Sequence, residues 1–175
     1  IVLIHETISF EVWLAAQMGG NAAAAYNESL NLQFRGAFDV ELFRAAAQQV
    51  IQRHPILLAK ISPDGQWQEF RLGTQVNAPL IDLGSYSEPE SGRQLAAVLE
   101  QEASELFDLV SGPLIRMKIV RMSDDHHVVV WTAHHIICDG WSAGLLVSEL
   151  AAIYSGLRQD LQPALETPIP FSEYA

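Results

Sequence analysis

The chain has 175 residues, 49% of them hydrophobic, which is enough apolar material for one globular domain with a buried core. Its formal net charge of -11 disfavours nucleic acid and anionic membrane surfaces as partners, because an acidic surface repels phosphate groups. The single cysteine, Cys138, excludes an internal disulfide framework and a cysteine-rich zinc site, and it fits a reducing cytoplasmic location. No apolar run approaches the ~20 residues of a membrane-spanning helix, and no signal-peptide pattern is present. The first residue is Ile rather than Met, so we expect the chain to be part of a longer protein.

The first part of the chain predicts a short helix and a strand. Residues 11–18 have a helical composition, and the two glycines that follow end the helix. Residues 26–35 alternate apolar and polar side chains from Leu30 to Phe34, which is typical of a strand with one buried face. The alanines at 22–25 fit a helix or a loop equally well.

A capped helix and a hairpin are expected next. Asp39 is a favourable N-cap for a helix that runs to about Arg53 with its apolar residues on one stripe, and a proline then stops it. The segments 56–61 and 66–72 flank Ser-Pro-Asp-Gly, a strong turn signal, and are predicted to pair as a hairpin.

The second half predicts a helix over 92–107, a hairpin of 114–122 with 126–133, and a helix over 141–157. The second strand of this hairpin is apolar on both faces, as expected of a central buried strand. The proline-rich segment 158–175 is interpreted as a linker or an exit from the domain. Helices mixed with antiparallel hairpins indicate an α/β fold of the α+β kind with a mixed sheet.

The stretch WTAHHIICDGWS joins the predicted central strand to the last helix. It places His134 and His135 four or five residues ahead of Asp139, which Gly140 follows. Side chains at such a junction reach a cleft while the strand fixes them. Gly140 allows a sharp turn and a close backbone approach, and the helix after it presents N–H groups to a developing negative charge.

Three interpretations of this motif compete. In the first, His134, His135 and Asp139 bind a metal, but the strand and the glycine break the helical spacing that such ligands would share. In the second, the histidines pack, which explains one of them more easily than both, because adjacent strand residues point to opposite faces. In the third, one imidazole is a general base for acyl transfer without a covalent enzyme intermediate. No Gly-x-Ser-x-Gly elbow is present, and Cys138 is either a nucleophile or, as is commoner for a lone thiol, packing.

His134-His135-Ile-Ile-Cys-Asp139-Gly140 resembles the HHxxxDG signature of condensation domains of nonribosomal peptide synthetases, which belong to the chloramphenicol acetyltransferase-like superfamily. The segment Arg53–Leu57 is similar to the start of the family's RHxxLR motif. Other similar segments occur in the family's order, and they are Trp13–Gln17, Ala25–Asn27, Phe34–Gly36 and Phe171–Ala175. The resemblance covers essentially the whole chain.

The resemblance implies that residues 1–175 form the N-terminal lobe of a V-shaped, two-lobed pseudodimer with a chloramphenicol acetyltransferase-like sandwich fold, the C-terminal lobe being absent from this chain. It implies an acyltransferase that forms an amide between an acyl or peptidyl thioester and an aminoacyl acceptor in nonribosomal peptide or hybrid polyketide–peptide biosynthesis. Both substrates would arrive on phosphopantetheine arms of carrier proteins, with no cofactor or metal bound directly. The expected partners are these carrier domains, the C-terminal lobe and flanking synthetase domains, and the isolated lobe is expected to be inactive.

The resemblance also assigns roles to residues. The second histidine of the family's motif, here His135, faces the tunnel between the lobes and acts as a base or positions the acceptor amine. His134, Asp139 and Gly140 are then expected to support the site, with Gly140 near the reacting carbonyl.

Position 58 departs from the family pattern. The RHxxLR motif ends in an arginine thought to brace the aspartate of the active-site loop, whereas this chain has Leu58. Either Arg53 or another cation is therefore expected to brace Asp139, or backbone N–H groups hold it. At the start of the following helix, Trp141 is expected to pack and Ser142 to cap.

Two other functions fit the same motif. A stand-alone acyltransferase that makes esters would need the same base, because the base does not define the nucleophile. A non-catalytic domain that recruits carrier proteins is suggested by the missing arginine at Leu58.

Overall fold

The computed structural model describes residues 2–5, 10–71 and 73–168, so the segment Phe171–Ala175 lies outside the described residues. The helices are α1 (Phe10–Gln17), α2 (Gly20–Ala24), α3 (Val40–Arg53), the 3-10 helix η1 (Pro55–Leu58), α4 (Glu88–Ser104) and α5 (Gly140–Arg158). The strands are β1 (Val2–His5), β2 (Asn27–Arg35), β3 (Ala59–Ile61), β4 (Trp67–Phe70), β5 (Leu80–Asp82), β6 (Ile115–Ser123) and β7 (His126–His134). Within the described part of the chain, no helix has both the length and the hydropathy that crossing a membrane requires.

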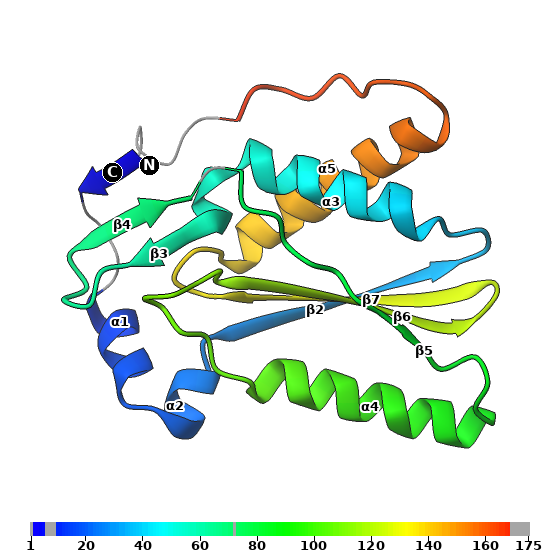
Figure 1. Ribbon diagram of the computed structural model, residues 1–175, viewed down its shortest axis with the longest axis horizontal. Helices are drawn as coiled ribbons and strands as arrows, with labels where there is room; N and C mark the ends of the chain where they lie inside the picture. The colour runs from blue at the N-terminus through cyan, green and yellow to red at the C-terminus, as the bar shows by residue number, and fades with distance from the viewer. Residues whose placement is uncertain (1, 6–9, 72, 169–175) are drawn as a thin grey trace.

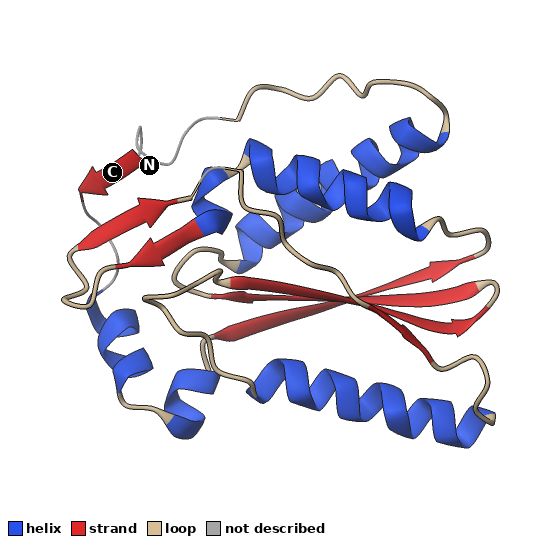
Figure 2. Cartoon of the chain, viewed as in Figure 1, coloured by secondary structure: helices blue, strands red, loops and turns tan. Residues whose placement is uncertain are grey.

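A four-stranded sheet lies between two helical layers, with α3 and α5 over one face and α4 over the other (Figure 1). Its strand order is β2-β7-β6-β5, in which β5 runs parallel to β6 and the other neighbours are antiparallel. Strands β1, β4 and β3 form a second, antiparallel sheet of three strands. Figure 2 shows the same separation of helices and strands into layers. The arrangement confirms the predicted mixed-sheet α/β fold.

Two apolar clusters fill the spaces between these layers. The larger one lies between the sheet and helices α3 and α5 and includes Val50, Trp131 and Leu150. The smaller one lies on the α4 side of the sheet, around Val128 and Val130. Every residue of β7 after the first is buried, as predicted for a central strand that packs against helices on both faces.

Most predicted elements are confirmed to within one residue at either end. These are the helices over 11–18 and 141–157, the strand over 26–35, and the hairpin of 114–122 with 126–133. Asp39 caps α3 as predicted, its side chain accepting from the backbone N–H groups of two residues in the first turn. The alanine run is largely helical, as α2.

Other boundaries were predicted wrongly. The segment 56–61 is a strand only from Ala59, because Pro55 starts a 3-10 turn with its fixed backbone angle. Helix α4 begins at Glu88 rather than at residue 92, since the proline after Glu88 lies in the first turn, where a missing N–H costs nothing. Strands β1 and β5 were not predicted.

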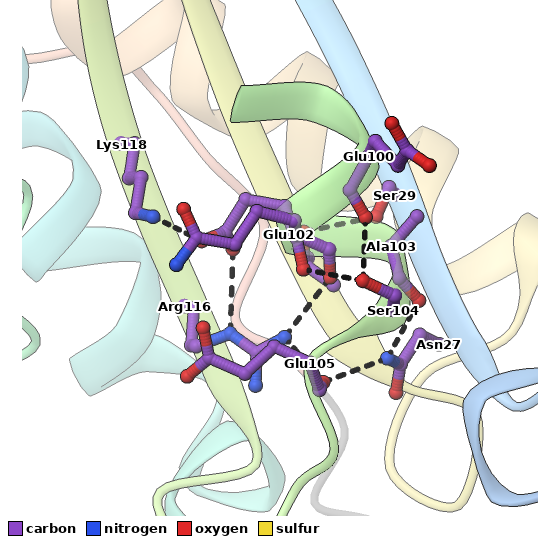
Figure 3. A network of polar contacts seen from close by, with 11 residues as sticks. Asn27, Ser29, Glu100, Glu102, Ala103, Ser104, Glu105, Arg116 and Lys118 are labelled. Atoms are coloured by element: carbon purple, nitrogen blue, oxygen red, sulfur yellow. Dashed lines mark hydrogen bonds and ion pairs between the residues drawn. The ribbon is translucent and has the colours of Figure 1, made fainter. Parts of the chain in front are cut away.

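A buried ionic network ties the end of α4 to the sheet (Figure 3). The side chain of Glu102 is fully buried, with Lys118 Nζ 2.7 Å from Oε1 and Arg116 Nε 3.3 Å from Oε2. Arg116 also donates to the carbonyls of Glu102 and Glu105, which a helix end leaves without partners. Asn27, the first residue of β2, donates to the Glu105 carbonyl at 2.9 Å. The start of β2 is thereby fixed against α4.

Candidate active site

The motif lies at the junction where β7 ends and α5 begins. The N–H of His135, the first residue after the strand, donates to the carbonyl of Tyr26 at 2.7 Å, so β2 still holds the backbone there. The N–H of Ile137 then donates to the His134 carbonyl at 3.0 Å and closes a turn. Ile137 and Cys138 are buried beneath this turn. The strand therefore fixes the junction, as the sequence predicted.

The two histidines face opposite sides of the sheet. The residue His134 is 2% exposed, and its ring lies near Tyr26 and Phe107, with ring centroids 6.2 and 6.1 Å away. Its Nδ1 accepts a hydrogen bond from the N–H of Ile136 at 3.2 Å. Burial, together with the neighbouring His135, lowers the pKa of His134 to about 4, so this imidazole is neutral near pH 7. His134 is a packed residue that shapes the turn.

His135 has the geometry of a base. Its side chain is 40% exposed, and its Nδ1 lies 2.7 Å from Oε1 of Glu28 on β2. Among the described residues, Nε2 of His135 makes no hydrogen bond. One ring nitrogen thus lies against a carboxylate oxygen, and the partly exposed ring is compatible with general-base chemistry.

Asp139 is held by a backbone N–H group. Its Oδ1 accepts from the N–H of Ser142 at 2.8 Å, and hydrogen bonding from Ser142 lowers the pKa of this carboxyl. Asp139 is therefore the N-cap of α5, so the expectation that Ser142 caps the helix was wrong: Ser142 is the donor.

Gly140 is the first residue of α5, and it is not required by the turn. A Cβ added to Gly140 would meet no atom within 4 Å, and its backbone does not adopt the left-handed conformation that favours glycine. The missing side chain instead leaves open space at the N-terminus of the helix.

Arg53 does not brace Asp139, which corrects one of the expected alternatives, whereas the other, that backbone N–H groups hold Asp139, agrees with the hydrogen bond from Ser142. Its Nε lies 3.0 Å from Oε2 of Glu149 on α5, and Nε2 of His54 lies 2.8 Å from the same oxygen. Burial by itself raises the pKa of Glu149, but these two contacts outweigh it and leave the pKa below its usual value. Leu58 is buried in the larger apolar cluster. Arg53 leaves the last turn of α3 toward α5, so it joins the two helices rather than reaching the loop.

Cys138 is not suited to be a nucleophile. Its burial, and the negative charges of Glu28 and Asp139, raise the pKa of the thiol to about 12, so the reactive thiolate is scarce near neutral pH. The metal interpretation requires His134 and His135 to converge with an acidic residue. Within the described residues, no group of three histidine, cysteine, aspartate or glutamate side chains is placed to hold an ion.

A small cavity of about 10 Å³, close to the space one water needs, lies beneath Glu28. Its other lining residues are apolar, and they are Leu30, Trp131, Ala133, Cys138, Ala143, Leu146 and Val147. Glu28 therefore lines the edge of the apolar core while its side chain stays 34% exposed.

Residues 11–175 match the family model described as the condensation domain. The chain belongs to the condensation-domain family. The chain is 29% identical over 167 residues to chondramide synthase cmdD of Chondromyces crocatus. This alignment covers 94% of the chain and 4% of that synthase. The chain is 32% identical over 166 residues to malpibaldin synthetase of Mortierella alpina, covering 94% of the chain and 3% of that synthetase.

A solved structure shows the same fold. The starter condensation domain of rhizomide synthetase RzmA superimposes with a TM-score of 0.87 at 23% identity, covering 99% of this chain and 42% of that one. The chain thus spans less than half of the RzmA chain and a small fraction of the synthetases that it resembles in sequence.

Sequence reasoning did not single out Glu28, which the structure places beside His135. A signal was present, because Glu28 precedes Leu30 by two residues and therefore shares its face of the strand. Trp141 was expected to pack, but it is 89% exposed, and Leu145 one turn later is 52% exposed. The sequence shows that Trp141 and Leu145 are hydrophobic, but it does not show whether other residues of this chain cover them.

Proposed function

We propose that this condensation domain supplies the base-bearing lobe of an acyltransferase that joins a carrier-bound acyl or peptidyl thioester to a carrier-bound aminoacyl group. The observation that carries the proposal is His135, whose side chain is 40% exposed and whose Nδ1 lies 2.7 Å from Oε1 of Glu28. The sequence similarity to nonribosomal peptide synthetases supports amide formation as the reaction.

The proposed reaction transfers an acyl group directly. The acceptor amine attacks the thioester carbonyl, so that a C–N bond forms and the carbonyl oxygen becomes negatively charged. His135 Nε2 takes the proton that the amine loses. The C–S bond then breaks, and the leaving thiolate receives the proton from His135. The raised pKa of the Cys138 thiol agrees with a route without a covalent enzyme intermediate.

The start of α5 suits this chemistry. The first turn of a helix has N–H groups without intrahelical acceptors, and the helix dipole favours negative charge there. Asp139 uses the N–H of Ser142, and the bare backbone at Gly140 leaves space for a reacting carbonyl. We propose that the remaining lobe, the carrier domains and flanking synthetase domains complete the site and deliver both substrates.

The test uses the complete two-lobed domain with loaded donor and acceptor carrier proteins, and product is measured by mass spectrometry. His135→Ala is expected to lower turnover by about a hundredfold to ten-thousandfold, the usual contribution of a general base. His126→Ala, at the opposite end of β7, is the control and is expected to keep turnover. Unchanged turnover in His135→Ala would refute the catalytic role.

Acceptor identity is tested in the same assay. A carrier-bound amine and an alcohol of similar size are offered side by side. Amide from the amine alone supports the proposal, whereas ester from the alcohol indicates an ester-forming transferase. Binding of the loaded carrier without turnover of either acceptor indicates a recruiting domain.

A further inference from the structure

We infer that Glu28 is a positioning residue for His135: its carboxylate holds the Nδ1–H, which makes Nε2 the basic nitrogen and directs it to the acceptor. The inference rests on the base role proposed for His135. The two side chains meet at 2.7 Å between Glu28 Oε1 and His135 Nδ1. An ionised carboxylate only accepts hydrogen bonds, so at this distance we infer that the neutral ring carries its proton on Nδ1 and its lone pair on Nε2.

The strand register places the pair. Glu28 on β2 lies opposite Ala133 on β7, and His135 follows Ala133 by two residues. Residues two apart share a face of the sheet, so Glu28 and His135 are diagonal neighbours on the side that α5 covers. Tyr26 on the same strand accepts the backbone N–H of His135 at 2.7 Å. Strand β2 therefore fixes both the backbone and the ring of this histidine.

Glu28 is held on a rigid segment. The neighbouring residue Asn27 donates to the carbonyls of Ala103 and Glu105 at the end of α4, both at 2.9 Å. Figure 3 shows Asn27 reaching toward the end of that helix. On the other side, Ser29 Oγ and Thr132 Oγ1 are hydrogen-bonded at 2.9 Å across the strands. Anchors on both sides hold the strand that carries Glu28 before substrate arrives, as a preorganised site requires.

The contact between Glu28 and His135 is partly shielded from water. The side chain of Glu28 is 34% exposed and that of His135 is 40% exposed, and Glu28 also lines the small apolar cavity described above. When His135 takes up a proton during acyl transfer, the carboxylate stabilises the imidazolium without accepting the proton itself. Glu28 thus acts through His135 and has no role that requires contact with substrate.

The kinetic test uses the complete domain with loaded carrier proteins. Glu28→Leu is expected to lower kcat by about tenfold to a hundredfold while KM for both carriers stays within about twofold, since the lost contact matters in the transition state. Glu28→Gln keeps an acceptor oxygen but not the charge. Its kcat is expected to lie between those of Glu28→Leu and the unsubstituted domain. Glu100→Leu, which removes an exposed carboxylate from α4, is the control and is expected to leave both constants unchanged.

The spectroscopic test reads the tautomer directly. In the domain labelled with ¹⁵N at histidine, His135 is expected to show a protonated Nδ1 and an unprotonated Nε2. In Glu28→Leu the proton is expected to move largely to Nε2, whereas Glu28→Gln retains the original tautomer. If Glu28→Leu does not fold, Glu28→Gln is used alone, because glutamine has the same shape as glutamate. A lower kcat in Glu28→Gln then supports the positioning role, and an unchanged kcat overturns it.

The outcomes separate this inference from the proposed function. If His135→Ala abolishes amide formation while Glu28→Leu keeps kcat and the tautomer, the positioning role is overturned and the base role stands. If the unsubstituted domain makes no amide, the proposed function fails, and the tautomer measurement still shows whether Glu28 sets the protonated nitrogen. A rise in KM without a change in kcat would also overturn the positioning role.

Discussion

Asp139 accepts the backbone N–H of Ser142 at 2.8 Å, which makes the carboxylate of the histidine motif the N-cap of α5. A single residue thereby ends the active-site turn and begins the helix behind it. Because the hydrogen bonds from Ser142 lower the pKa of Asp139, the cap is strongest when this carboxyl is ionised.

Asp139→Ala is expected to lower the free energy of unfolding by about 1 kcal/mol, and Asp139→Asn by less, since asparagine also caps helices. A carboxyl with a lowered folded-state pKa contributes stability above its unfolded pKa and loses it as pH falls through the folded value. The difference between the unsubstituted domain and Asp139→Ala should therefore shrink in acid. Urea unfolding at pH 7 and pH 3 measures it, and a difference that grows in acid would contradict the cap.

Gly140→Ala tests the open space at the start of α5. Nothing in the described structure obstructs a Cβ at Gly140, so the free energy of unfolding should stay unchanged or rise by up to about 1 kcal/mol. Turnover of the complete domain should fall, because the methyl group would occupy space proposed for the reacting carbonyl. Gly144→Ala, at an equally open position of the same helix, should keep turnover. Equal turnover in both variants would show that substrate does not use this space.

Glu102→Gln probes the network that ties α4 to the sheet. Burial alone raises the pKa of Glu102, but Lys118 and Arg116 outweigh it and leave the pKa below its usual value. Breaking a buried ion pair on one side costs on the order of 3 kcal/mol, so this variant should be markedly less stable. The unsubstituted domain should lose stability as pH falls through the lowered pKa of Glu102, and Glu102→Gln should not show this part of the loss.

Chemical denaturation across pH 3 to 7 (about the titration range of carboxyl groups) provides the measurement for Glu102→Gln. The matched control is Glu100→Gln, an exposed position two residues earlier on α4, which should change the free energy of unfolding by less than about 0.5 kcal/mol. A similar loss in both variants would show that the network does not stabilise the fold.

Cys138→Ala tests the covalent alternative. Because the thiol is buried and its pKa is raised to about 12, the variant should retain turnover within about twofold. In the unsubstituted domain, iodoacetamide should alkylate this cysteine far more slowly in the folded than in the urea-unfolded protein. Loss of turnover in a folded Cys138→Ala variant would restore the thiol as a nucleophile.

Because the side chain of Trp141 is exposed, we expect another surface to cover this tryptophan in the complete domain. We also expect residues 1–175 alone to give no turnover, since the remaining lobe is absent from this chain. Hydroxyl-radical footprinting is carried out on the isolated residues 1–175 and on the complete domain. Trp141 should be oxidised in the isolated chain and protected in the complete domain. Tyr86, 49% exposed in the loop before α4, is the internal control and should react equally in both. Turnover by the isolated chain, or equal oxidation of Trp141, would contradict the prediction.

The elements predicted correctly are those whose pattern is local and long. The central strand β7 and the capped helix α3 each carry a strong signal within their own residues. The three-residue strand β5 carries too short a pattern to recognise, and it joins the sheet only by lying parallel to β6.

The active site shows a similar division. The opposite faces of His134 and His135 follow from strand geometry and could be predicted. The partner of Arg53 could not, because Glu149 lies on a helix far away in sequence and only the packing of α3 against α5 brings the two together. For Asp139 the sequence left Arg53, another cation or backbone N–H groups as alternatives, and the structure shows the N–H of Ser142 as the partner.

Asn27 and Glu28 are consecutive residues of β2 that serve opposite faces of the sheet, one contacting α4 and the other His135. A slip of β2 by one residue against β7 would exchange these faces, removing the carboxylate from the imidazole and the amide from the helix end in one step. Inserting or deleting a residue at this end of the strand is therefore a more damaging change than its distance from the histidine motif in sequence suggests.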